Sequence, residues 1–454
     1  MTRLGDVCEK IGSGATPRGG KEAYKDAGIP IIRSQNIHDW VFQPDGLAFL
    51  DDEQAESLSN VEVRSNDVLL NITGDSVARA CIVPSERIPA RVNQHVAIVR
   101  AGKEINPTYL LASLQSKKTT LLSLASSGAT RNALTKRMIE NLDIDLPSRE
   151  MQDSIAQVLD SIQYKITLNN RLNDYLFELV SSVFAHRFSD NVNTTELKNV
   201  LSISTKALKP QEHADEIWEH YSIPAFDEKH RPIFEPASGI KSNKYQIDSE
   251  CILISKLNPS TKRIWMPCCS SNNAVCSTEF IVYRPYLKEY KSFYYAAIDS
   301  PRFTDYLLEH VSGSTGSRQR AQPKDTLNYL MPNPDNEEIK DFCTFADPIY
   351  RHIQINEQQT AKLELLRETL LPKLMSGAID VSKVDLTQLT NNHLWVHGHN
   401  VPNRYWKGRL WKPSLIMFCH RCRTCSIRHS SNIWPKYSES RYCQLRKHPC
   451  RRIC

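Results

Sequence analysis

The sequence lacks the long apolar segments of membrane-spanning and secreted proteins. No apolar run approaches the roughly 20 residues that cross a bilayer, and the N-terminus has no charged segment followed by an apolar one. We therefore expect a soluble, cytoplasmic protein with no membrane partner. At 454 residues the chain is longer than one ordinary hydrophobic core requires, so two or three domains are expected.

The sequence also lacks the motifs of common nucleotide-dependent enzymes. It has no Asn-Pro-Pro-aromatic methyltransferase motif, no GxxxxGK(S/T) phosphate loop and no Rossmann fingerprint. Pro334–Lys340 (PDNEEIK) offers the carboxylates and lysine of a nuclease metal site, but its acids crowd at one helix start, where the helix dipole favours them. We expect no catalytic site and no bound metal or cofactor. A stand-alone nuclease or restriction enzyme fragment is the alternative, and a purely structural helical adaptor is a third hypothesis.

Positive charge is concentrated at the C-terminus. From Trp395 to Cys454, 13 Lys and Arg accompany one acid, Glu439, so residues 1–394 hold 44 basic and 50 acidic residues. The same segment holds six of the 13 cysteines and four of the seven tryptophans. This shift in composition predicts that residues 381–454 are a tail that is foreign to the fold, disordered or not native to it.

The cysteines favour free thiols over a metal site. Seven lie in residues 1–394, an odd number with no paired metal spacing, which is typical of a reducing compartment. The tail contains residues that could be written as a zinc site, but their spacing is irregular. These are Cys419, His420, Cys422, Cys425, Cys443, His448, Cys450 and Cys454.

An internal repeat organises residues 1–394. Asn66–Pro84 is similar to Ser249–Pro267 at an offset of 183, and each segment reads as a buried strand, a polar loop and a second strand ending in Pro. Asn93–Val99 lies over Cys276–Val282 at the same offset, again a polar lip before an apolar run. Each half ends in a long helical pattern, and these patterns are related by an offset of 187.

The two helical patterns step by three and four residues, as in a coiled coil. The predicted seam positions are Ile155, Leu159, Ile162, Ile166, Asn169, Leu172, Leu176, Leu179 and Val183, and then Phe342, Ala346, Ile349, Ile353, Asn356, Leu363, Leu366 and Leu370. A helix of about 40 residues is about 60 Å long, which suits a spacer.

One polar residue recurs inside each predicted seam. Asn169 and Asn356 occupy the same repeat position, where a polar side chain costs stability but fixes register. We expect the two helices to pair antiparallel, with both asparagines near the crossing. The alternative is that both asparagines face solvent.

These patterns predict a mixed α/β fold with a pseudo-twofold internal repeat. Two tandem α/β domains, at residues 1–147 and 191–334, are separated by two long antiparallel coiled-coil helices at 148–190 and 335–380. Two similar modules held apart by rigid helices suit a two-headed reader of a linear target, for which double-stranded DNA is the natural candidate. Because the loops of the two halves differ, the predicted site is bipartite and asymmetric.

At this point the residues match a known family. The Gly12–Gly14 loop, GIPIIRSQNI at Gly28–Ile37, NDVLLNITG at Asn66–Gly74, the following NQHVAIV, and LLPKLMSGAIDVS at Leu370–Ser382 resemble the specificity subunits of type I restriction-modification systems. The resemblance covers residues 1 to about 392, and LLPKLMSG is its most specific piece. The chain departs from the family in starting directly with MTRLGDV and in its tail.

The resemblance implies two target-recognition domains and helices that dock two methyltransferase subunits. Those subunits would carry S-adenosylmethionine. Further restriction/translocase subunits would carry ATP and Mg²⁺ for translocation and cleavage. This chain itself would be non-catalytic and hold no cofactor.

Base recognition needs paired donors and acceptors on loops or helix starts. Candidates in the first half are Arg33, Gln35, Asn36, Thr73, Asp75, Arg79, Asn93, Gln94, His95, Arg131, Asn132, Thr135 and Lys136. Candidates in the second half are Lys256, Asn258, Lys262, Arg263, Arg318, Gln319, Arg320 and Lys324. Any one of them could be a solvated loop residue, but both halves place Gly, Ser and Arg together just before the long helix.

Overall fold

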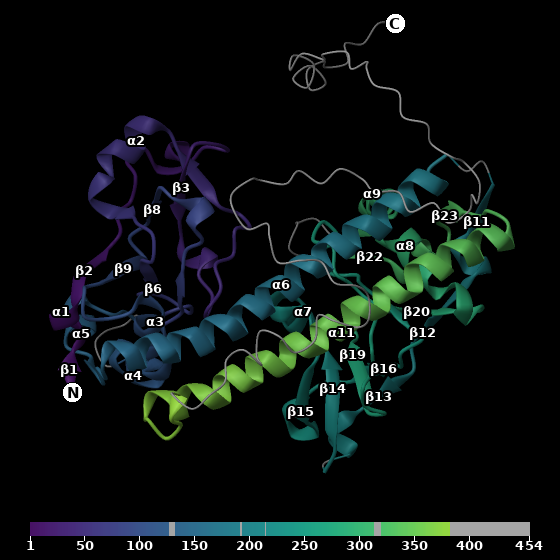
Figure 1. The fold of residues 1–454 in the computed structure, drawn as a ribbon. Helices are drawn as coiled ribbons and strands as arrows, with labels where there is room; N and C mark the ends of the chain where they lie inside the picture. The colour runs from purple at the N-terminus through teal and green to yellow at the C-terminus, as the bar shows by residue number, and fades with distance from the viewer. Residues whose placement is uncertain (127–131, 191–192, 214, 313–318, 382–454) are drawn as a thin grey trace, which may run out of the picture. The chain divides into compact units, whose positions relative to one another are not determined.

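The computed structural model describes residues 1–126, 132–190, 193–213, 215–312 and 319–381, and all of these belong to one compact unit, Met1–Asn392 (Figure 1). Arg131, Arg318 and the tail from residue 382 onward lie outside the described residues. We call the α/β layers before the first long helix the first lobe, and those between the two long helices the second lobe.

The first lobe is built on two sheets. The antiparallel sheet β2-β9-β6-β7 consists of β2 (Cys8–Ser13), β9 (Val96–Ala101), β6 (Val68–Asn71) and β7 (Ala80–Ile82). The sheet β4-β3-β8-β5 consists of β4 (Ala48–Leu50), β3 (Ile29–Ile32), β8 (Ala90–Val92) and β5 (Glu62–Val63), with β3 and β8 parallel. The lobe also contains β1 (Thr2–Arg3), β10 (Asp143–Ile144), α1 (Leu4–Val7), α2 (Asp52–Ser57), α3 (Pro107–Ser116), α4 (Lys118–Ser126) and α5 (Lys136–Glu140).

The second lobe is also built on two sheets, a four-stranded one and a five-stranded one. The antiparallel sheet β12-β20-β17-β18 consists of β12 (Leu201–Ser204), β20 (Phe280–Pro285), β17 (Ile252–Ser255) and β18 (Ile264–Trp265). The sheet β13-β16-β19-β14-β15 consists of β13 (Ala207–Leu208), β16 (Lys244–Gln246), β19 (Ala274–Ser277), β14 (Ile217–Tyr221) and β15 (Ile233–Pro236), with β14 and β19 parallel. The remaining elements are β11 (Thr194–Glu196), β21 (Val311–Ser312), β22 (Arg320–Ala321), β23 (Leu330–Pro332), α7 (Ile223–Lys229), α8 (Lys291–Asp299), α9 (Pro301–Glu309) and α10 (Pro323–Thr326).

Two helices of 40 residues each, α6 (Arg149–Phe188) and α11 (Asn336–Met375), run antiparallel and side by side (Figure 1). Each begins with a side-chain cap: Ser148 Oγ accepts from the Met151 amide at 3.4 Å, and Asp335 Oδ1 accepts from the Glu338 amide at 2.9 Å. The carboxylate of Asp335 therefore caps a helix, as its position before α11 predicted.

Each long helix is anchored in both lobes. Near its start α6 places Ile155 and Leu159 in the core of the first lobe, and near its end it places Phe184 and Phe188 in the core of the second. In α11 the order is reversed, since Phe342 packs in the second lobe and Leu371 and Leu374 pack in the first. The LLPKLMSG segment is therefore a core element of the first lobe. Burial at both ends fixes the helices as a strut between the lobes.

The predicted seam is wrong at three leucines. Leu172, Leu179 and Leu366 are 37%, 45% and 40% exposed, whereas the neighbouring Asn173 is 7% exposed and Val180 is fully buried. The physical reason is that an α-helix has about 3.6 residues per turn, whereas a strict seven-residue repeat assumes about 3.5. The buried face of the helix therefore moves gradually away from the positions that the repeat predicts. Along α6 this drift replaces Leu172 by Asn173.

The strand offset is 184 and not the predicted 183. Val68 pairs with Val99 in the first lobe, and Ile252 pairs with Tyr283 in the second, so both partners shift by 184 positions. The side chains agree, because Val68 and Ile252 both face the core that packs on α6 and α11. A shift of one residue exchanges the two faces of a strand. Since β6 and β17 are buried on both faces, their apolar sequences carry no alternation that could reveal the error.

Several broader expectations can be compared with the described residues. No helix in this part of the chain is long and apolar enough to cross a membrane. The seven cysteines of residues 1–381 are free thiols, as predicted, and within the same described ranges no group of His, Cys, Asp and Glu is arranged to hold a metal ion. The potential zinc ligands of the tail lie outside the described residues.

Candidate nucleic-acid interface

Three loops of the first lobe that contain predicted DNA-reading residues meet in space. We call residues 72–79, 93–95 and 132–136 the first loop cluster. The Ile72 amide donates to the His95 carbonyl at 3.0 Å, and the Gly74 amide donates to the Asn132 carbonyl at 3.3 Å. The Leu134 amide closes the set by donating to the Ile72 carbonyl at 2.8 Å. Backbone bonds thus hold together residues that are up to 62 positions apart in the sequence.

The second lobe builds the same arrangement, which we call the second loop cluster, from residues 256–263, 277–279 and 319–324. The Lys256 amide donates to the Glu279 carbonyl at 2.9 Å, the Asn258 amide to the Gln319 carbonyl at 3.0 Å, and the Ala321 amide to the Lys256 carbonyl at 2.9 Å. These three bonds match those of the first cluster one by one.

A backbone turn at the centre of each cluster strengthens the correspondence. Gly74 has a φ of 77°, and Asn258, which is 184 positions later, has a φ of 50°. Glycine and asparagine are the residues that adopt this left-handed conformation at least cost. Asn258 therefore has a conformational role in addition to its predicted role in reading DNA. Its side-chain Oδ1 is buried without a hydrogen-bond partner.

A fourth predicted loop, Arg33–Asn36, adjoins the first cluster. Asn71 Nδ2 donates to the Ser34 carbonyl at 2.9 Å, and the Asn93 amide donates to the Ile32 carbonyl at 3.0 Å. Within this loop Asn36 is fully buried, and its side-chain amide donates to the Gln43 and Asp45 carbonyls. Because its donors are used inside the loop, Asn36 is placed to hold the loop and not to present an amide to DNA.

The loop's other two predicted residues converge on one acceptor. Arg33 Nη2 donates to the Gly46 carbonyl at 2.6 Å, and Gln35 Nε2 donates to the same oxygen at 3.3 Å. Gln35 is exposed and Arg33 is partly buried, with its guanidinium 5.8 Å from the centre of the Tyr24 ring.

Several predicted basic residues are held by acids of their own lobe. Arg263 makes a two-pronged ion pair with Asp227, with Nε–Oδ1 at 2.5 Å and Nη2–Oδ2 at 2.9 Å, and its side chain is 11% exposed. Lys262 pairs with Asp299, Arg320 with Glu279, and Lys136 with Glu140. For Arg263 burial and a bidentate partner indicate a structural role.

Other candidates are available for contact. Among the described residues, no side-chain hydrogen bond or ion pair holds Arg79, Lys256 or Lys324. Asp75, Gln94 and Asn132 are exposed, and Asn93 is buried with its Oδ1 accepting from the His95 amide at 3.1 Å. Thr135 caps α5 by accepting from the Met138 amide at 3.2 Å, and Gln319 is partly buried.

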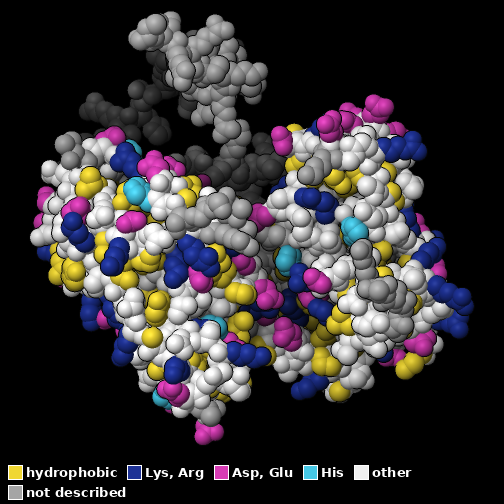
Figure 2. Space-filling model, turned by 180° about the vertical axis from the view of Figure 1, so that it is seen from behind, with side chains coloured by type: hydrophobic (Ala, Val, Ile, Leu, Met, Phe, Trp, Pro, Cys, Tyr) yellow, Lys and Arg dark blue, Asp and Glu magenta, His cyan; other side chains and the backbone are white. Residues whose placement is uncertain are grey.

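The surface charge is mixed. On the face drawn in Figure 2, Lys and Arg are interspersed with Asp and Glu, and acidic side chains gather over α2. There the exposed acids Asp51, Asp52, Glu53 and Glu56 follow one another closely. The excess of acidic residues in the chain without its tail therefore also appears on this part of the surface. Strong binding of DNA phosphates by this chain alone is not expected.

The two seam asparagines lie at the interface of the long helices. Asn169 Nδ2 donates to Gln359 Oε1 at 2.9 Å and Thr360 Oγ1 at 3.4 Å, and Asn356 Nδ2 donates to Asn173 Oδ1 at 2.8 Å. Asn169 is 1% exposed and Asn356 is 5% exposed. The alternative in which both face solvent is therefore wrong, and the antiparallel pairing is confirmed.

Sequence reasoning missed the polar partners in this interface. Asn173, Thr360 and Arg367 are buried there, and Asn173 and Thr360 differ by the same 187 positions as Asn169 and Asn356. Arg367 donates to Gln163 Oε1 and lies 5.0 Å from the centre of the Trp40 ring, and burial lowers its pKa. A search for apolar positions passes over such residues, although the offset of 187 could have found the Asn173–Thr360 pair.

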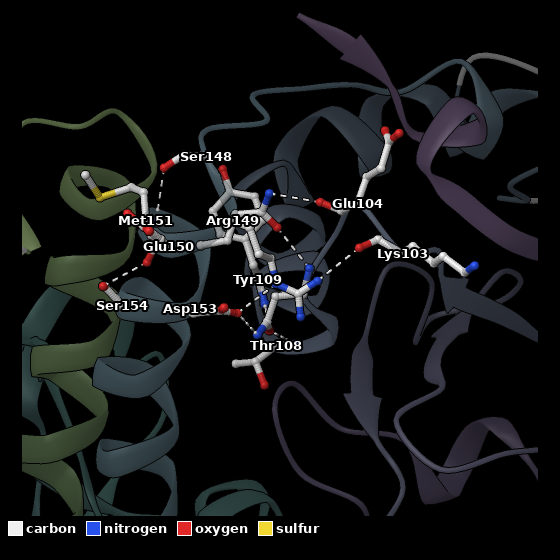
Figure 3. Close-up of polar contacts among 12 residues, drawn as sticks. Lys103, Glu104, Thr108, Tyr109, Ser148, Arg149, Glu150, Met151, Asp153 and Ser154 are labelled. Atoms are coloured by element: carbon white, nitrogen blue, oxygen red, sulfur yellow. Dashed lines mark hydrogen bonds and ion pairs between the residues drawn. The ribbon is translucent and has the colours of Figure 1, made fainter.

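The start of α6 is tied to the first lobe by the contacts in Figure 3. Asp153 Oδ1 accepts from Arg149 Nε at 2.9 Å and from Asn106 Nδ2 at 2.7 Å, and Arg149 Nη1 donates to the Lys103 carbonyl at 3.1 Å. The Arg149 and Asn106 donors lower the pKa of Asp153. The adjacent residue, Gln152, accepts through Oε1 from the Asn106 amide at 2.9 Å.

The second lobe is tied to α11 by the loop after α7. Glu364 accepts from Lys229 Nζ at 3.1 Å and pairs with Arg231, so one carboxylate holds two cations. One heptad earlier, Glu357 lies 3.8 Å from His230. Burial lowers the pKa of His230 and raises the pKa of Glu357 to about 7, so this second contact is not a full ion pair at neutral pH.

Comparisons with known proteins agree with this architecture. The family described as "Type I restriction modification DNA specificity domain" matches residues 1–176. A protein of Methanocaldococcus jannaschii named as the type I restriction enzyme MjaX specificity subunit is 23% identical over 178 residues, which are 38% of this chain and 41% of that protein. The match thus spans less than half of the relative's length.

Among solved structures, the type I restriction-modification S subunit from M. genitalium is similar with a TM-score of 0.51 and 14% identity, covering 82% of this chain and 95% of that chain. This similarity shows that the mixed α/β fold is shared. The HsdS subunit from Thermoanaerobacter tengcongensis covers 83% of this chain and 96% of that chain at 18% identity, with a TM-score of 0.32.

Proposed function

The first 176 residues of this chain belong to the type I restriction modification DNA specificity domains, and from this premise we propose that the chain reads a bipartite, asymmetric DNA site. The first loop cluster binds one half-site and the second loop cluster binds the other. The paired helices α6 and α11 set the unread distance between them. In this proposal the chain supplies recognition only, and chemistry belongs to its partners.

One observation carries the proposal: the same three-loop arrangement occurs in both lobes, and each long helix is anchored in both cores. Equivalent bonds, such as Ile72 to His95 and Lys256 to Glu279, hold the loops in one geometry while their side chains differ. Rigid scaffolds that present variable loops are typical of recognition surfaces. Different side chains on the same scaffold suit two different half-sites related by a pseudo-twofold repeat.

Partner docking is proposed on the outward face of the helix pair. Tyr164 and Tyr175 of α6 are 70% and 67% exposed, and Leu172 and Leu179 continue the same side of the helix. On α11, Ile355 and Leu365 are 53% and 65% exposed. Apolar stripes of this size on a soluble helix are typical of protein interfaces. We propose that two methyltransferase subunits bind there, and that restriction/translocase subunits join the same complex.

The cofactors of the reaction are assigned to those partners. S-adenosylmethionine would be bound by the methyltransferase subunits, and ATP and Mg²⁺ by the restriction/translocase subunits. The loop clusters of this chain supply hydrogen-bond donors such as Lys256 and Arg79, which suit base edges and phosphates. Because the chain without its tail is acidic, we propose that partner subunits complete the positive surface around DNA.

Single-molecule methylome sequencing of the host, with and without this gene, tests the proposal. The expected result is one asymmetric bipartite motif that is methylated only when the gene is present. A motif that is continuous, or no change in methylation, would contradict it. Incubating the purified chain with DNA and Mg²⁺ distinguishes this proposal from the stand-alone nuclease alternative. A nuclease is expected to cleave the DNA without partner subunits, and the proposed specificity subunit is not.

A further inference from the structure

A chain of three side chains crosses the first loop cluster. Gln94 Nε2 lies 3.1 Å from His95 Nε2, and His95 Nδ1 lies 2.7 Å from Thr73 Oγ1. Gln94 is exposed, while His95 and Thr73 are partly buried. From the solvent-exposed end inward, the order is therefore amide, imidazole and hydroxyl.

The chemistry of the first group sets the direction of the whole chain. An amide NH₂ group only donates, so His95 Nε2 accepts and carries no proton. A neutral imidazole then bears its proton on Nδ1, which donates to Thr73 Oγ1. Protonation of the ring would keep this Nδ1–H in place. One of the two acceptor lone pairs of Thr73 Oγ1 is thereby occupied, and its own O–H remains to donate elsewhere.

The backbone around these groups is fixed before any ligand arrives. The His95 amide donates to Asn93 Oδ1 at 3.1 Å, and the His95 carbonyl accepts from the Ile72 amide at 3.0 Å. Thr73 forms an antiparallel bridge with Ala133. A donor held on a scaffold of this kind loses little conformational freedom when it bonds to a ligand.

The second loop cluster has no such relay at the equivalent positions. Ile72 and His95 correspond to Lys256 and Glu279 by the offset of 184, so Thr73 corresponds to Leu257, which has no hydroxyl. Glu279 instead accepts from Arg320 Nε at 3.2 Å. The neutral relay is therefore a property of the first lobe, and the two lobes differ chemically at a matched place.

We propose that His95 is a positioning residue that holds the Thr73 hydroxyl as a donor, and that Thr73 donates to a hydrogen-bond acceptor of DNA bound at the first loop cluster. The inference rests on the proposed function. The acceptor is a base atom, namely purine N7, guanine O6 or thymine O4, or else a phosphate oxygen. Cytosine N4 and adenine N6 are donors, so neither can accept the Thr73 O–H.

The experiment uses the full chain co-expressed with its partner subunits. Methylome sequencing first defines the wild-type site, and absence of any site would contradict the proposed function before the relay is tested. Methylation rates are then measured on duplexes that vary each position of the half-site read by the first lobe. The variants are Thr73→Val, which keeps the shape and removes the hydroxyl, Thr73→Ser, which restores it, and His95→Leu, which removes the positioning group.

If the acceptor is a base, Thr73→Val lowers the rate on the cognate duplex by about tenfold and flattens preference at one base pair, the loss that one hydrogen bond to a base implies. If the acceptor is a phosphate, the rate falls on all duplexes, and a methylphosphonate at one backbone position removes the difference between wild type and variant. Either outcome supports the donor role, provided that Thr73→Ser restores it.

His95→Leu tests the positioning role separately. It keeps the Thr73 hydroxyl but removes the Nδ1–H that occupies one of its lone pairs, so the hydroxyl can turn to accept, and discrimination against cytosine, which offers only a donor at N4, is expected to weaken by severalfold. Preference at the half-site read by the second lobe is the internal control and stays unchanged. Equal preferences and rates for wild type and Thr73→Val overturn the inference, and so does a His95→Leu effect limited to melting temperature.

Discussion

The buried pair formed by Asn173 and Asn356 leads to a quantitative prediction about the long helices. Asn356 Nδ2 donates to Asn173 Oδ1 at 2.8 Å, and the two residues are 5% and 7% exposed. Asn356→Leu leaves the Asn173 carbonyl oxygen buried without a donor. We therefore expect the free energy of unfolding to fall by about 1–3 kcal/mol, the cost of an unsatisfied buried polar group.

A double-mutant cycle isolates this interaction. Replacing both residues by leucine removes both polar groups, so the double variant is expected to be less destabilised than the sum of the single variants by about 1–2 kcal/mol. Urea unfolding of the full chain with a helix-sensitive signal is the assay. Asn169 and Asn356 are the matched control pair, because Asn169 bonds to Gln359 and Thr360 and not to Asn356.

The control pair should be additive within about 0.5 kcal/mol, since the residues share no partner. The Asn169→Leu, Asn356→Leu double variant also tests register: two fewer polar groups in the interface should permit other pairings of the helices. If its melting temperature and oligomeric state match those of wild type, the asparagines do not specify register. A coupling energy near zero between Asn173 and Asn356 would refute the energetic argument.

Burial raises the folded-state pKa of Glu357 to about 7 from an unfolded value of 4.5. Between these two values the folded state binds a proton that the unfolded state releases, so the free energy of unfolding falls as pH rises from about 4.5 to about 7. In thermal melts across pH, Glu357→Gln should therefore be more stable than wild type at pH 8, by about 1–3 kcal/mol, and equal to it near pH 4. Lys256→Ala should leave the melting temperature unchanged but weaken DNA binding by the assembled complex, and the slope of binding affinity against salt concentration should fall by about 1. Arg263→Ala should lower the melting temperature, because it leaves Asp227 without its bidentate partner. Equal effects of the two variants on the melting temperature would contradict the distinction between a free and a structural cation. Glu364→Gln removes the negative charge that pairs with Lys229 and Arg231, and faster hydrogen exchange in residues 229–231 with unchanged exchange in α3 is expected. Unchanged exchange in residues 229–231 would show that the ion pairs do not hold this loop.

Much of the architecture was predictable because it depends on local periodicity. The long helices are read from apolar residues that recur every three or four positions. The family resemblance carried by segments such as Asn66–Gly74 is confirmed by the match to residues 1–176, whereas Leu370–Ser382 lies outside that match. The repeat predicted that candidate loops recur in both halves, but the structure showed that the loops around Thr73, His95 and Asn132 meet in space.

The candidate site was less predictable, because pairing between distant side chains leaves no periodic signal. Arg263 and Lys256 look alike in the sequence, yet Asp227 holds the first and no described side chain holds the second. Asn36 was chosen as a possible base reader, but its amide is used by the Gln43 and Asp45 carbonyls. These roles depend on residues that are brought together only when the sheets form.

The sequence by itself predicted a duplicated plan: two α/β halves, each followed by a long amphipathic helix, with an asparagine at the same place in both. The tertiary structure alone decided the strand offset, the helix positions that are buried and the cations that are already paired. The physical reason is that β6 and β17 are buried on both faces and show no alternation, and that a 40-residue helix shifts its buried face with each turn. In both cases the neighbouring element, and not the local sequence, selects which side chain points inward.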